Sequence, residues 1–480
     1  MEYNNIRRSQ VFTPKKYAKL LLSSAKYDSG LYGKKILENS FGDGAILVEI
    51  VQAYIDDCKK NELDEKDIAR GLAQDIYGYE IDKEKYNICL NRLNELILKN
   101  GISIKVNWNL KNDDFLKAKI LIKFSYIVGN PPYISYKQLN SEERHFLNNS
   151  FESCKYGRFD YCYAFVEKSI ELLDEYGEMS YLIPNSIYKN VSAKYLRNII
   201  DPYVHRIIDN YGAEVFPGVN VSTSIMCLRK DASTTIDYYD NITNNSFSVD
   251  KTQLHEKWIF AKDLSTENYN TIDFGTIYNV GSTPATLFNK AFIFEPDCED
   301  ESFFYINGFK IEKEIVKKAA SPKSYAFLKK EYIIFPYKIQ NKHLIRFDET
   351  AFKENFPCAF SYLESFKDKL IAKNNESGVN WFEYGRSQAL INMDQEKLMM
   401  SIIITNAVKV YELSKDEIPY SGIYITSTNK EHDLVFAKQI LGSDNFLKYV
   451  NNIGITSSGK SKRITPNDVK NYKIRRNEWI

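Results

Sequence analysis

The sequence predicts an α/β protein in which a doubly wound domain is followed by an irregular α/β second domain. Between Lys35 and about Lys230, short β-rich apolar runs alternate with longer helical patterns, as expected for βαβ units around a mainly parallel sheet. The chain has 480 residues, of which 44% are hydrophobic. That length exceeds one ordinary domain of about 100–200 residues. We therefore expect two domains, at residues 1–235 and 250–480.

Five strands and three helices are expected in the first domain. The expected helices span residues 45–58, 83–99 and 161–176, where apolar residues recur at helical spacing. The expected strands are KKILEN (34–39), DIYGYEI (75–81), FSYIVGN (124–130), GEMSYLIPN (177–185) and SIMCLRK (224–230).

A polar stretch separates the two expected domains. Residues 231–253, DASTTIDYYDNITNNSFSVDKTQ, are rich in Asn, Ser, Thr and Asp, which predicts a linker or loop. The sequence after it has many Tyr and Phe residues but no clean period and no internal repeat. The second domain is therefore expected to be of mixed α/β type.

Composition excludes several classes of protein. The 7 cysteines form no CxxC pair and the 5 histidines are dispersed, so the sequence predicts no metal site and no disulfide framework. The first residues lack the apolar core of a signal peptide, and no apolar run reaches the roughly 18 residues of a membrane span. We therefore expect a cytoplasmic protein. The net charge of +1 leaves the partner open, and any basic surface would have to be local.

The sharpest motif follows the strand predicted at 124–130. Asn130, Pro131, Pro132 and Tyr133 come at its carboxyl end, and ligands of open α/β sheets bind at that edge. An adenine amino group is a poor nucleophile, but the Asn130 side-chain oxygen and a nearby backbone carbonyl could accept its two N–H bonds. The prolines would fix the Pro131 carbonyl, and Tyr133 could stack on an extruded base. The alternative is a rigid turn without chemistry.

A second motif follows the first strand, where Gly42 and Gly44 precede the helix expected from Ala45. Such a loop lets a ligand approach free N–H donors at the helix start. Leu47 replaces the third glycine of a dinucleotide fingerprint, which disfavours pyrophosphate. Glu38 at the strand end could meet the cationic amino-acid part of a sulfonium cofactor, and the alternative is a solvent-facing acid that caps the helix.

Two further acids follow in the expected order along the chain. Glu80 ends the second strand and is a candidate for the two ribose hydroxyls of an adenosyl group. Asp114 could accept a hydrogen bond from the cofactor's adenine, and Phe115 could pack on its ring. By itself an Asp-Asp-Phe segment is more typical of a loop. The assignment of Asp114 and Phe115 to the cofactor site therefore depends on the order of all the motifs along the chain.

Taken in order, these segments resemble the γ class of amino-methylating DNA methyltransferases. The resemblance covers essentially the whole chain and is strongest through about residue 230. It implies a Rossmann-like class I methyltransferase domain followed by a DNA target recognition domain, with S-adenosyl-L-methionine as cofactor and double-stranded DNA as partner. The segments concerned are VFTP (11–14), ENSFGDG (38–44), GYEID (78–82), NDDF (112–115), GNPPY (129–133), GEMSYLIPNS (177–186) and EVFPGVNVSTSIMCL (214–228).

The resemblance assigns a role to each motif residue. It implies that the adenine N6 amino group of a flipped base is methylated, with Asn130, Pro131, Pro132 and Tyr133 as catalytic residues and with Tyr133 and Phe216 packing on the base. The residues implied to hold the cofactor are Thr13, Pro14, Glu38, Ser40, Gly42, Glu80, Ile81, Asp114, Phe115 and Asn130. This chain departs from the family's usual acid loop at Asn39 and Phe41.

Basic residues of the second domain are candidates for DNA contacts. They are Lys338, Arg386, Lys460, Lys462 and Arg463, and their alternative role is surface charge. A separately encoded restriction endonuclease is a further partner compatible with the resemblance. A fused nuclease is not expected, because little sequence precedes Phe12.

Two other functions fit part of these observations. A glutamine-amide or rRNA adenine methyltransferase could use the same strand end, but roughly 230 residues after the linker exceed an ordinary domain of about 100–150 residues and favour a long duplex. A catalytically idle DNA-specificity subunit is the other alternative. The intact segment from Asn130 to Tyr133 argues against it.

Overall fold

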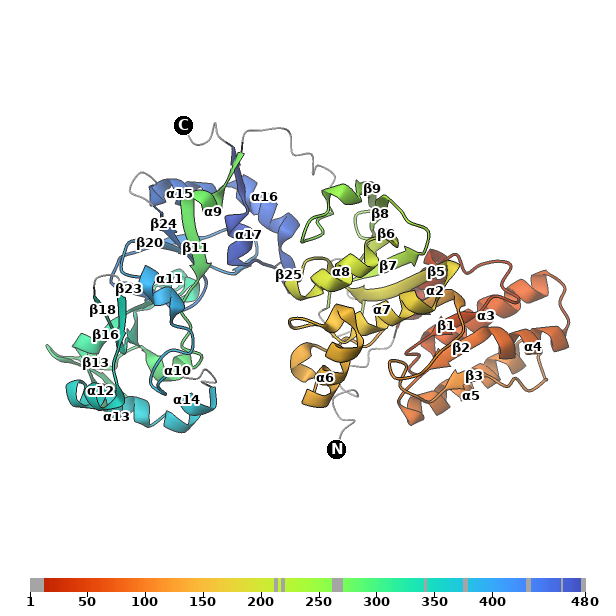
Figure 1. Ribbon diagram of the computed structural model, residues 1–480, viewed down its shortest axis with the longest axis horizontal. Coiled ribbons are helices and arrows are strands. Elements are labelled where there is room, and N and C mark those ends of the chain that lie inside the picture. Colours follow the sequence, from red (N-terminus) through yellow and green to blue (C-terminus); the bar gives the residue numbers. More distant parts are fainter. Residues whose placement is uncertain are drawn as a thin grey trace. The chain divides into compact units, whose positions relative to one another are not determined.

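The computed structural model consists of two compact units, Met1–Leu264 and Ser265–Ile480, each described here by itself (Figure 1). It describes residues 13–210, 215–216, 221–260, 271–340, 343–373, 379–428, 433–458 and 461–475. The boundary lies after residue 264, whereas the sequence placed it between residues 235 and 250. Among the described residues, no helix is both long and apolar enough to cross a membrane.

A nine-stranded mixed sheet forms the centre of the first unit, in the order β3-β2-β1-β4-β5-β7-β6-β8-β9. Strands β3, β2, β1, β4 and β5 are mutually parallel, and β7 pairs antiparallel with both β5 and β6. The strands are β1 (Ile36–Glu38), β2 (Ile76–Tyr79), β3 (Asn109–Lys111), β4 (Phe124–Gly129), β5 (Leu173–Pro184), β6 (Val204–Asp209), β7 (Thr223–Arg229), β8 (Thr235–Asp240) and β9 (Asn245–Asp250).

Helices cover both faces of this sheet, which makes the unit doubly wound as expected (Figure 1). Successive strand residues point to opposite faces. Ile36 accordingly packs with helices α2 to α5, whereas Leu37 packs with α6 to α8. The helices are α2 (Lys15–Ser24), α3 (Ala45–Lys60), α4 (Glu65–Asp75), α5 (Lys83–Lys99), α6 (Ser141–Ser150), α7 (Cys162–Leu172) and α8 (Lys194–Ile200), with short 3₁₀ turns η1 (Tyr136–Gln138), η2 (Glu152–Cys154), η3 (Asn185–Tyr188), η4 (Val191–Ala193) and η5 (Lys251–Gln253).

The five predicted strands are confirmed, and the three predicted helices are present, although α3 and α7 have ends that differ from the prediction. Helix α7 stops at Leu172, and β5 begins at Leu173, so the predicted helix 161–176 is too long at its carboxyl end. The apolar residues after Phe165 suit both a buried helix and a buried strand, and periodicity alone does not separate them.

The predicted linker at 231–253 is wrong, because its centre forms the antiparallel strands β8 and β9. Strand β8 also pairs in parallel with β6 and so extends the main sheet. Ile236 and Val249 face one another across the hairpin and are both buried. The Asn, Thr and Asp residues that suggested a loop are concentrated at the turn, where Asn244 adopts a φ of 56°.

The second unit contains several small sheets in its described part instead of one large sheet, as its irregular sequence predicts. An aromatic core holds them together, in which Phe352 stacks on Phe382 with ring centroids 4.7 Å apart. Its helices are α9 (Phe274–Ile277), α10 (Asn289–Phe292), α11 (Pro322–Ala326), α12 (Glu349–Asn355), α13 (Pro357–Glu364), α14 (Lys367–Lys373), α15 (Leu434–Leu441), α16 (Asp444–Ile453) and α17 (Pro466–Lys470), with turns η6 (Lys313–Ile315) and η7 (Gln388–Asn392).

The strands of the second unit are short and belong to six groups in the described residues. They are β11 (Tyr278–Ser282) with β24 (Ile423–Ser427), β20 (Lys397–Met400) and β22 (Val410–Leu413); β12 (Ile293–Phe294) with β17 (Glu331–Ile334), β16 (Val316–Ala320) and β23 (Glu417–Pro419); β13 (Cys298–Glu299) with β14 (Phe303–Ile306) and β15 (Phe309–Glu312); β18 (Tyr337–Gln340) with β19 (His343–Arg346); β21 (Ile403–Ile404) with β26 (Ser461–Arg463) and β25 (Ile455–Ser458); and β10 (Thr271–Asp273) with β27 (Lys473–Arg475).

Gly44, which precedes α3, gives the first testable prediction. Its φ is 87°, and a Cβ added there would lie 2.5 Å from Cys89 Sγ. Gly30, with a φ of 63° and no heavy atom within 4 Å of an added Cβ, is a matched control. We expect Gly30→Ala to lower the free energy of unfolding by about 1 kcal/mol through backbone strain alone. Gly44→Ala should lower it by about 2–4 kcal/mol, because a clash is added. Urea unfolding followed by circular dichroism measures both, and equal losses would contradict this packing.

Candidate active site

The predicted motifs meet at the point where the strand order of the main sheet changes direction. From β1 the chain moves to β2 and β3 on one side and then returns to β4 on the other. Strands β1 and β4 pair in parallel, with Leu37 opposite Ile127, so their carboxyl ends open at the same edge. In open α/β sheets, ligands bind at such a switch point. The loops that begin at Asn39 and Asn130 flank it.

Asn130 directly follows β4, and one neighbouring side chain holds its amide. The Asn130 Nδ2 donates to Thr13 Oγ1 at 3.1 Å, and Ser40 Oγ lies 3.4 Å from the backbone oxygen of Asn130. The Asn130 Oδ1 is buried and has no hydrogen-bond partner. A buried acceptor without a partner is costly, typically by about 1–3 kcal/mol. The Asn130 Oδ1 is therefore a candidate to accept a hydrogen bond from a ligand.

Tyr133 lies against the neighbouring strand and against Phe216. Its hydroxyl donates to the backbone oxygen of Leu182 in β5 at 2.9 Å, and burial raises the pKa of the phenol well above its ordinary value. The Tyr133 and Phe216 rings meet edge to face, with centroids 6.3 Å apart. Phe216 is fully buried. Tyr133 and Phe216 are thus brought together as expected, although the Phe216 ring has no exposed surface in this state.

Glu38 ends β1 and is almost completely buried, with 2% of its surface exposed. It is therefore not the solvent-facing acid of the alternative interpretation. Its Oε2 has no partner. Burial, followed by the negative charges of Glu80 and Asp43, raises the pKa of this carboxyl well above its ordinary value, although a hydrogen bond from the Leu47 backbone opposes the shift. Such a carboxyl would be stabilised in its charged form by a cation.

Glu80 ends β2 and connects the second motif to the first. Its two carboxylate oxygens accept the backbone N–H groups of Gly42 and Asp82, each at 2.8 Å. Burial raises the pKa of Glu80, and these two N–H bonds partly offset the effect. Ile81 follows it at the sheet edge and is half-buried, and its backbone oxygen accepts Asn112 Nδ2 at 3.1 Å. Glu80 therefore fixes the glycine loop as well as presenting a carboxylate at this edge.

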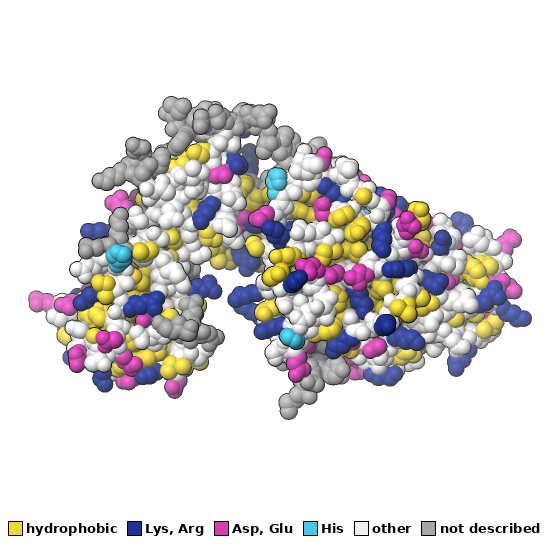
Figure 2. Space-filling model, viewed as in Figure 1, with side chains coloured by type: hydrophobic (Ala, Val, Ile, Leu, Met, Phe, Trp, Pro, Cys, Tyr) yellow, Lys and Arg dark blue, Asp and Glu magenta, His cyan; other side chains and the backbone are white. Residues whose placement is uncertain are grey.

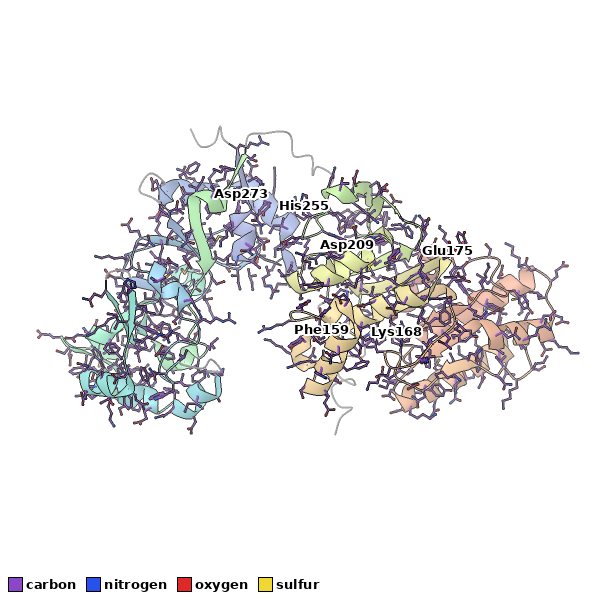
Figure 3. All side chains as sticks on the ribbon, in the orientation of Figure 1. Phe159, Lys168, Glu175, Asp209, His255 and Asp273 are labelled. Carbon is purple, nitrogen blue, oxygen red and sulfur yellow. The ribbon has the colours of Figure 1, made fainter. Side chains whose placement is uncertain are left out.

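Asp114 and Phe115 lie beyond β3, and helix α7 contacts them. Phe115 is buried with its ring 5.4 Å from that of Phe165, and Lys168 Nζ lies 5.0 Å from its centroid. Lys168, labelled in Figure 3, donates to the backbone oxygens of Phe115, Leu116 and Ala118, and burial lowers its pKa. Neither Phe165 nor Lys168 was among the site residues predicted from the sequence. Their spacing of three residues on one helix face was the available signal.

The two departures from the family's usual acid loop are explained by packing. Phe41 is buried next to Tyr86, at a ring distance of 6.0 Å, and its side chain fills the space above Gly78. Asn39 is buried, and its Nδ2 donates to Ser169 Oγ at 2.9 Å and also to the Tyr181 hydroxyl. Its Oδ1 has no partner. Phe41 is thus a core residue, whereas Asn39 adds one more open acceptor to the edge.

The basic residues expected to contact DNA differ in their exposure. Lys338 and Arg386 are exposed, and Lys338 Nζ lies 5.2 Å from the Phe347 ring centroid. Arg463 is also exposed, but Lys462 is buried and donates to Thr456 Oγ1 at 3.3 Å, so it does not present its charge to a partner as expected. Lys460 lies outside the described residues. Figure 2 shows basic and acidic side chains interspersed over the visible face.

The residues at this edge suit S-adenosyl-L-methionine. Glu38 Oε2, Asn39 Oδ1 and Asn130 Oδ1 are buried acceptors without partners, and Glu80 adds a second carboxylate. The cofactor is cationic and bears an ammonium group, ribose hydroxyls and an adenine amine as donors. An anionic pyrophosphate would instead meet two buried carboxylates, which agrees with the missing third glycine. In the part of the chain that the structure describes, no group of three or more His, Cys, Asp or Glu side chains could hold a metal ion.

Comparisons with known proteins lead to the same region of the chain. Residues 18–216, which include most of these motifs, match the family model described as Eco57I restriction-modification methylase. The chain is 26% identical over 334 residues to the type II restriction enzyme and methyltransferase RM.Eco57I of Escherichia coli, a match that covers 60% of this chain and 33% of that protein. It is 30% identical over 220 residues to the type II methyltransferase M.BstVI of Geobacillus stearothermophilus, covering 43% of this chain and 39% of that protein.

The fold also matches a solved structure over nearly the whole chain. The type IIL restriction-modification enzyme MmeI, solved in complex with DNA, superposes with a TM-score of 0.60 at 14% identity, covering 98% of this chain and 65% of that one. The chain spans only a third to two fifths of the length of the two sequence relatives. Residues 18–216 of the chain are therefore similar to the Eco57I restriction-modification methylases.

Proposed function

We propose that this protein is a site-specific DNA methyltransferase that transfers a methyl group from S-adenosyl-L-methionine to N6 of a flipped-out adenine. The observation that supports this most directly is the Asn130 Oδ1, a buried acceptor without a partner at the switch point of the sheet. The match of residues 18–216 to the Eco57I restriction-modification methylase model supports the reaction class and the cofactor. The mixed sheet is compatible with the Rossmann-like class I methyltransferase fold.

Asn130 supplies the acceptor that the reaction needs. The adenine amino group becomes a better nucleophile when its N–H bonds are held out of conjugation with the ring. Asn130 Oδ1 would accept one N–H of the adenine amino group, and the Pro131 carbonyl would accept the other. Both acceptors are preorganised. Thr13 holds the Asn130 amide in place, and the restricted φ angles of Pro131 and Pro132 fix the Pro131 carbonyl.

The target base has to leave the duplex to reach Asn130. A stacked adenine cannot approach an acceptor buried at the sheet edge, and enzymes that modify bases extrude them at a cost of a few kcal/mol. Tyr133, which is half-buried and held by Leu182, can offset part of that cost by stacking on the base. Phe216 packs on the edge of Tyr133 and supports that ring.

The cofactor, when bound, supplies the electrophilic methyl group. Glu38 would hold its cationic amino-acid part together with Thr13, Pro14 and Ser40. The glycine loop at Gly42 and the acids Glu80 and Asp114 would hold the adenosyl part, with Ile81 and Phe115 beside them. The carboxylates at this edge would exclude anionic competitors by charge.

The second unit is proposed to select the DNA sequence. Its exposed Lys338, Arg386 and Arg463 are candidates for phosphate or base contacts. The solved MmeI complex contains DNA, and its fold extends over both units of this chain. A separately encoded endonuclease remains a possible partner of such an enzyme.

Asn130→Ala is the direct test of this chemistry. Loss of a preorganised acceptor should slow methyl transfer to unmethylated plasmid DNA by about 10²-fold or more. The cofactor affinity should stay within a few fold, since other residues hold most of the cofactor. Radioactive methyl incorporation and calorimetry measure the two quantities. Asn91→Ala, an exposed residue on α5, is the control and should match the wild type. Near-normal transfer by Asn130→Ala would show that the assignment is wrong.

A third prediction concerns the protons that are released when the cofactor binds. The raised pKa of Glu38 favours its protonated form in the free protein, and a bound cation lowers that pKa. In the pH range between the lowered and the raised pKa, cofactor binding should therefore release protons, and affinity should rise as pH increases toward the raised pKa of the free protein.

Calorimetry in two buffers of different ionisation enthalpy measures this release. Glu38→Gln should abolish it, because the amide does not titrate. Glu95→Gln on the exposed face of α5 should release protons as the wild type does. Equal release by the wild type and by Glu38→Gln would remove Glu38 from the cofactor site.

A further inference from the structure

Two surface segments of the first unit lie beside the proposed catalytic loop. Residues 152–158 follow β4, residues 189–195 follow β5, and both strands end at the edge where Asn130 lies. Ser135, two residues after Tyr133, forms a β-bridge with Asp160. The neighbouring Phe159 is labelled in Figure 3. The two segments also touch, since a Cβ added to Gly157 would lie 3.6 Å from Ser192 Cβ.

These segments present an unusual combination of exposed aromatic, apolar and basic side chains. Tyr156 is 53% exposed and Val191 is 75% exposed. The Tyr156 ring stacks on Tyr195 at a centroid distance of 4.9 Å and an interplanar angle of 30°. Three exposed cations belong to the same two segments, and Lys155 Nζ lies 6.0 Å from the Tyr156 ring centroid. We call the set the Tyr156 surface: Lys155, Tyr156, Arg158, Val191 and Lys194.

A buried arginine, Arg197, supports the backbone of this surface through hydrogen bonds. Arg197 is 3% exposed, and its Nη1 donates to the backbone oxygens of Ile187 and Asn190, at 2.7 and 2.8 Å. Its Nη2 donates to the backbone oxygen of Glu256. Burial lowers the pKa of Arg197 to about 10. The turn before Val191 is therefore held in place, so the exposed side chains rest on a fixed support.

The cations of the Tyr156 surface are available to a polyanion. Lys155 pairs with Glu152 at 3.0 Å and Lys194 with Glu256 at 3.2 Å, but all four side chains are about half exposed or more. Pairs of this kind contribute little and are screened by salt. Each ammonium can turn to a phosphate without leaving a buried charge unpaired. An exposed aromatic ring with cations in the same surface segments is the pattern found where proteins bind single-stranded nucleic acid by stacking.

We propose that the Tyr156 surface binds the DNA strand next to the extruded nucleotide. Tyr156 stacks on a base that extrusion has unstacked, Val191 lies against the same gap, and Lys155, Arg158 and Lys194 contact the adjoining phosphates. This inference rests on the proposed function, because it requires a duplex opened at the Asn130 edge. It adds a group of DNA contacts supplied by the catalytic unit itself.

Tyr156→Ala tests the stacking role against Tyr176→Ala. Tyr176 is 89% exposed and lies near the amino end of β5, at the opposite edge of the same sheet. Loss of one stacked base should raise the KM for unmethylated plasmid DNA about tenfold in Tyr156→Ala. Tyr176→Ala should keep the wild-type KM, and Tyr156→Phe, which retains the ring, should do the same. Calorimetric cofactor affinity should be unchanged in all three, which verifies the fold.

The salt dependence of DNA binding tests the three cations together, independently of the Tyr156 ring. In Lys155→Ala/Arg158→Ala/Lys194→Ala, the log–log slope of DNA affinity against salt should fall by about 0.9 for each lost phosphate contact. Lys99→Ala on α5, at an exposed position, should leave the slope unchanged.

The possible outcomes separate this inference from the proposed function. A wild-type chain that transfers no methyl group to plasmid DNA overturns both. An active wild type with an unchanged KM in Tyr156→Ala overturns the Tyr156 surface alone. A Tyr156→Ala variant that changes from dimer to monomer in sedimentation, with KM unchanged, assigns the surface to a second copy of the chain and also overturns the proposal.

Discussion

The parallel pairing of β1 with β4 is the constraint on which the site depends. Leu37 lies opposite Ile127 in this pair, and the two strands belong to opposite halves of a sheet that is wound in both directions. Because the chain leads from β1 to β2 on one side and β4 lies on the other, the loops after Glu38 and Gly129 can both face the gap between the two carboxyl ends. A register shift of one residue would turn Glu38 and Asn130 toward the helices. Packing of the core therefore determines the geometry of the chemistry.

Unpaired acceptors are the second feature that unifies the site. Most buried polar atoms in folded proteins have partners, so three open oxygens near one sheet edge call for a ligand rich in donors. Glu38 and Glu80 both have raised pKa values, chiefly through burial, so a negative charge is disfavoured at this edge. A cationic cofactor and a neutral amino group relieve both costs. The same arrangement would hold neither a pyrophosphate nor a substrate made only of acceptors.

Much of the first unit follows from its sequence, for identifiable reasons. The buried strands around Leu37 and Ile127 are short apolar runs with turn residues after them, so their existence and the position of Asn130 could be predicted. The strands β8 and β9 could not, because they lie at the end of the sheet and their solvent-facing residues are polar and resemble a loop. The contacts of Lys168 depend on how α7 packs over Phe115, which the order of residues does not specify. Lys462 was misjudged because a basic run in sequence does not reveal which of its side chains alternate inward.

The central claim is that the chain methylates adenine in a particular DNA sequence, and one measurement addresses it directly. The chain would be expressed in a host that lacks DNA methylation, and its plasmid DNA would be sequenced by a method that detects modified bases. The account predicts N6-methyladenine at every copy of one short sequence and at no other position. Plasmid DNA without methylated adenine, or with the methyl group on cytosine instead, would contradict it.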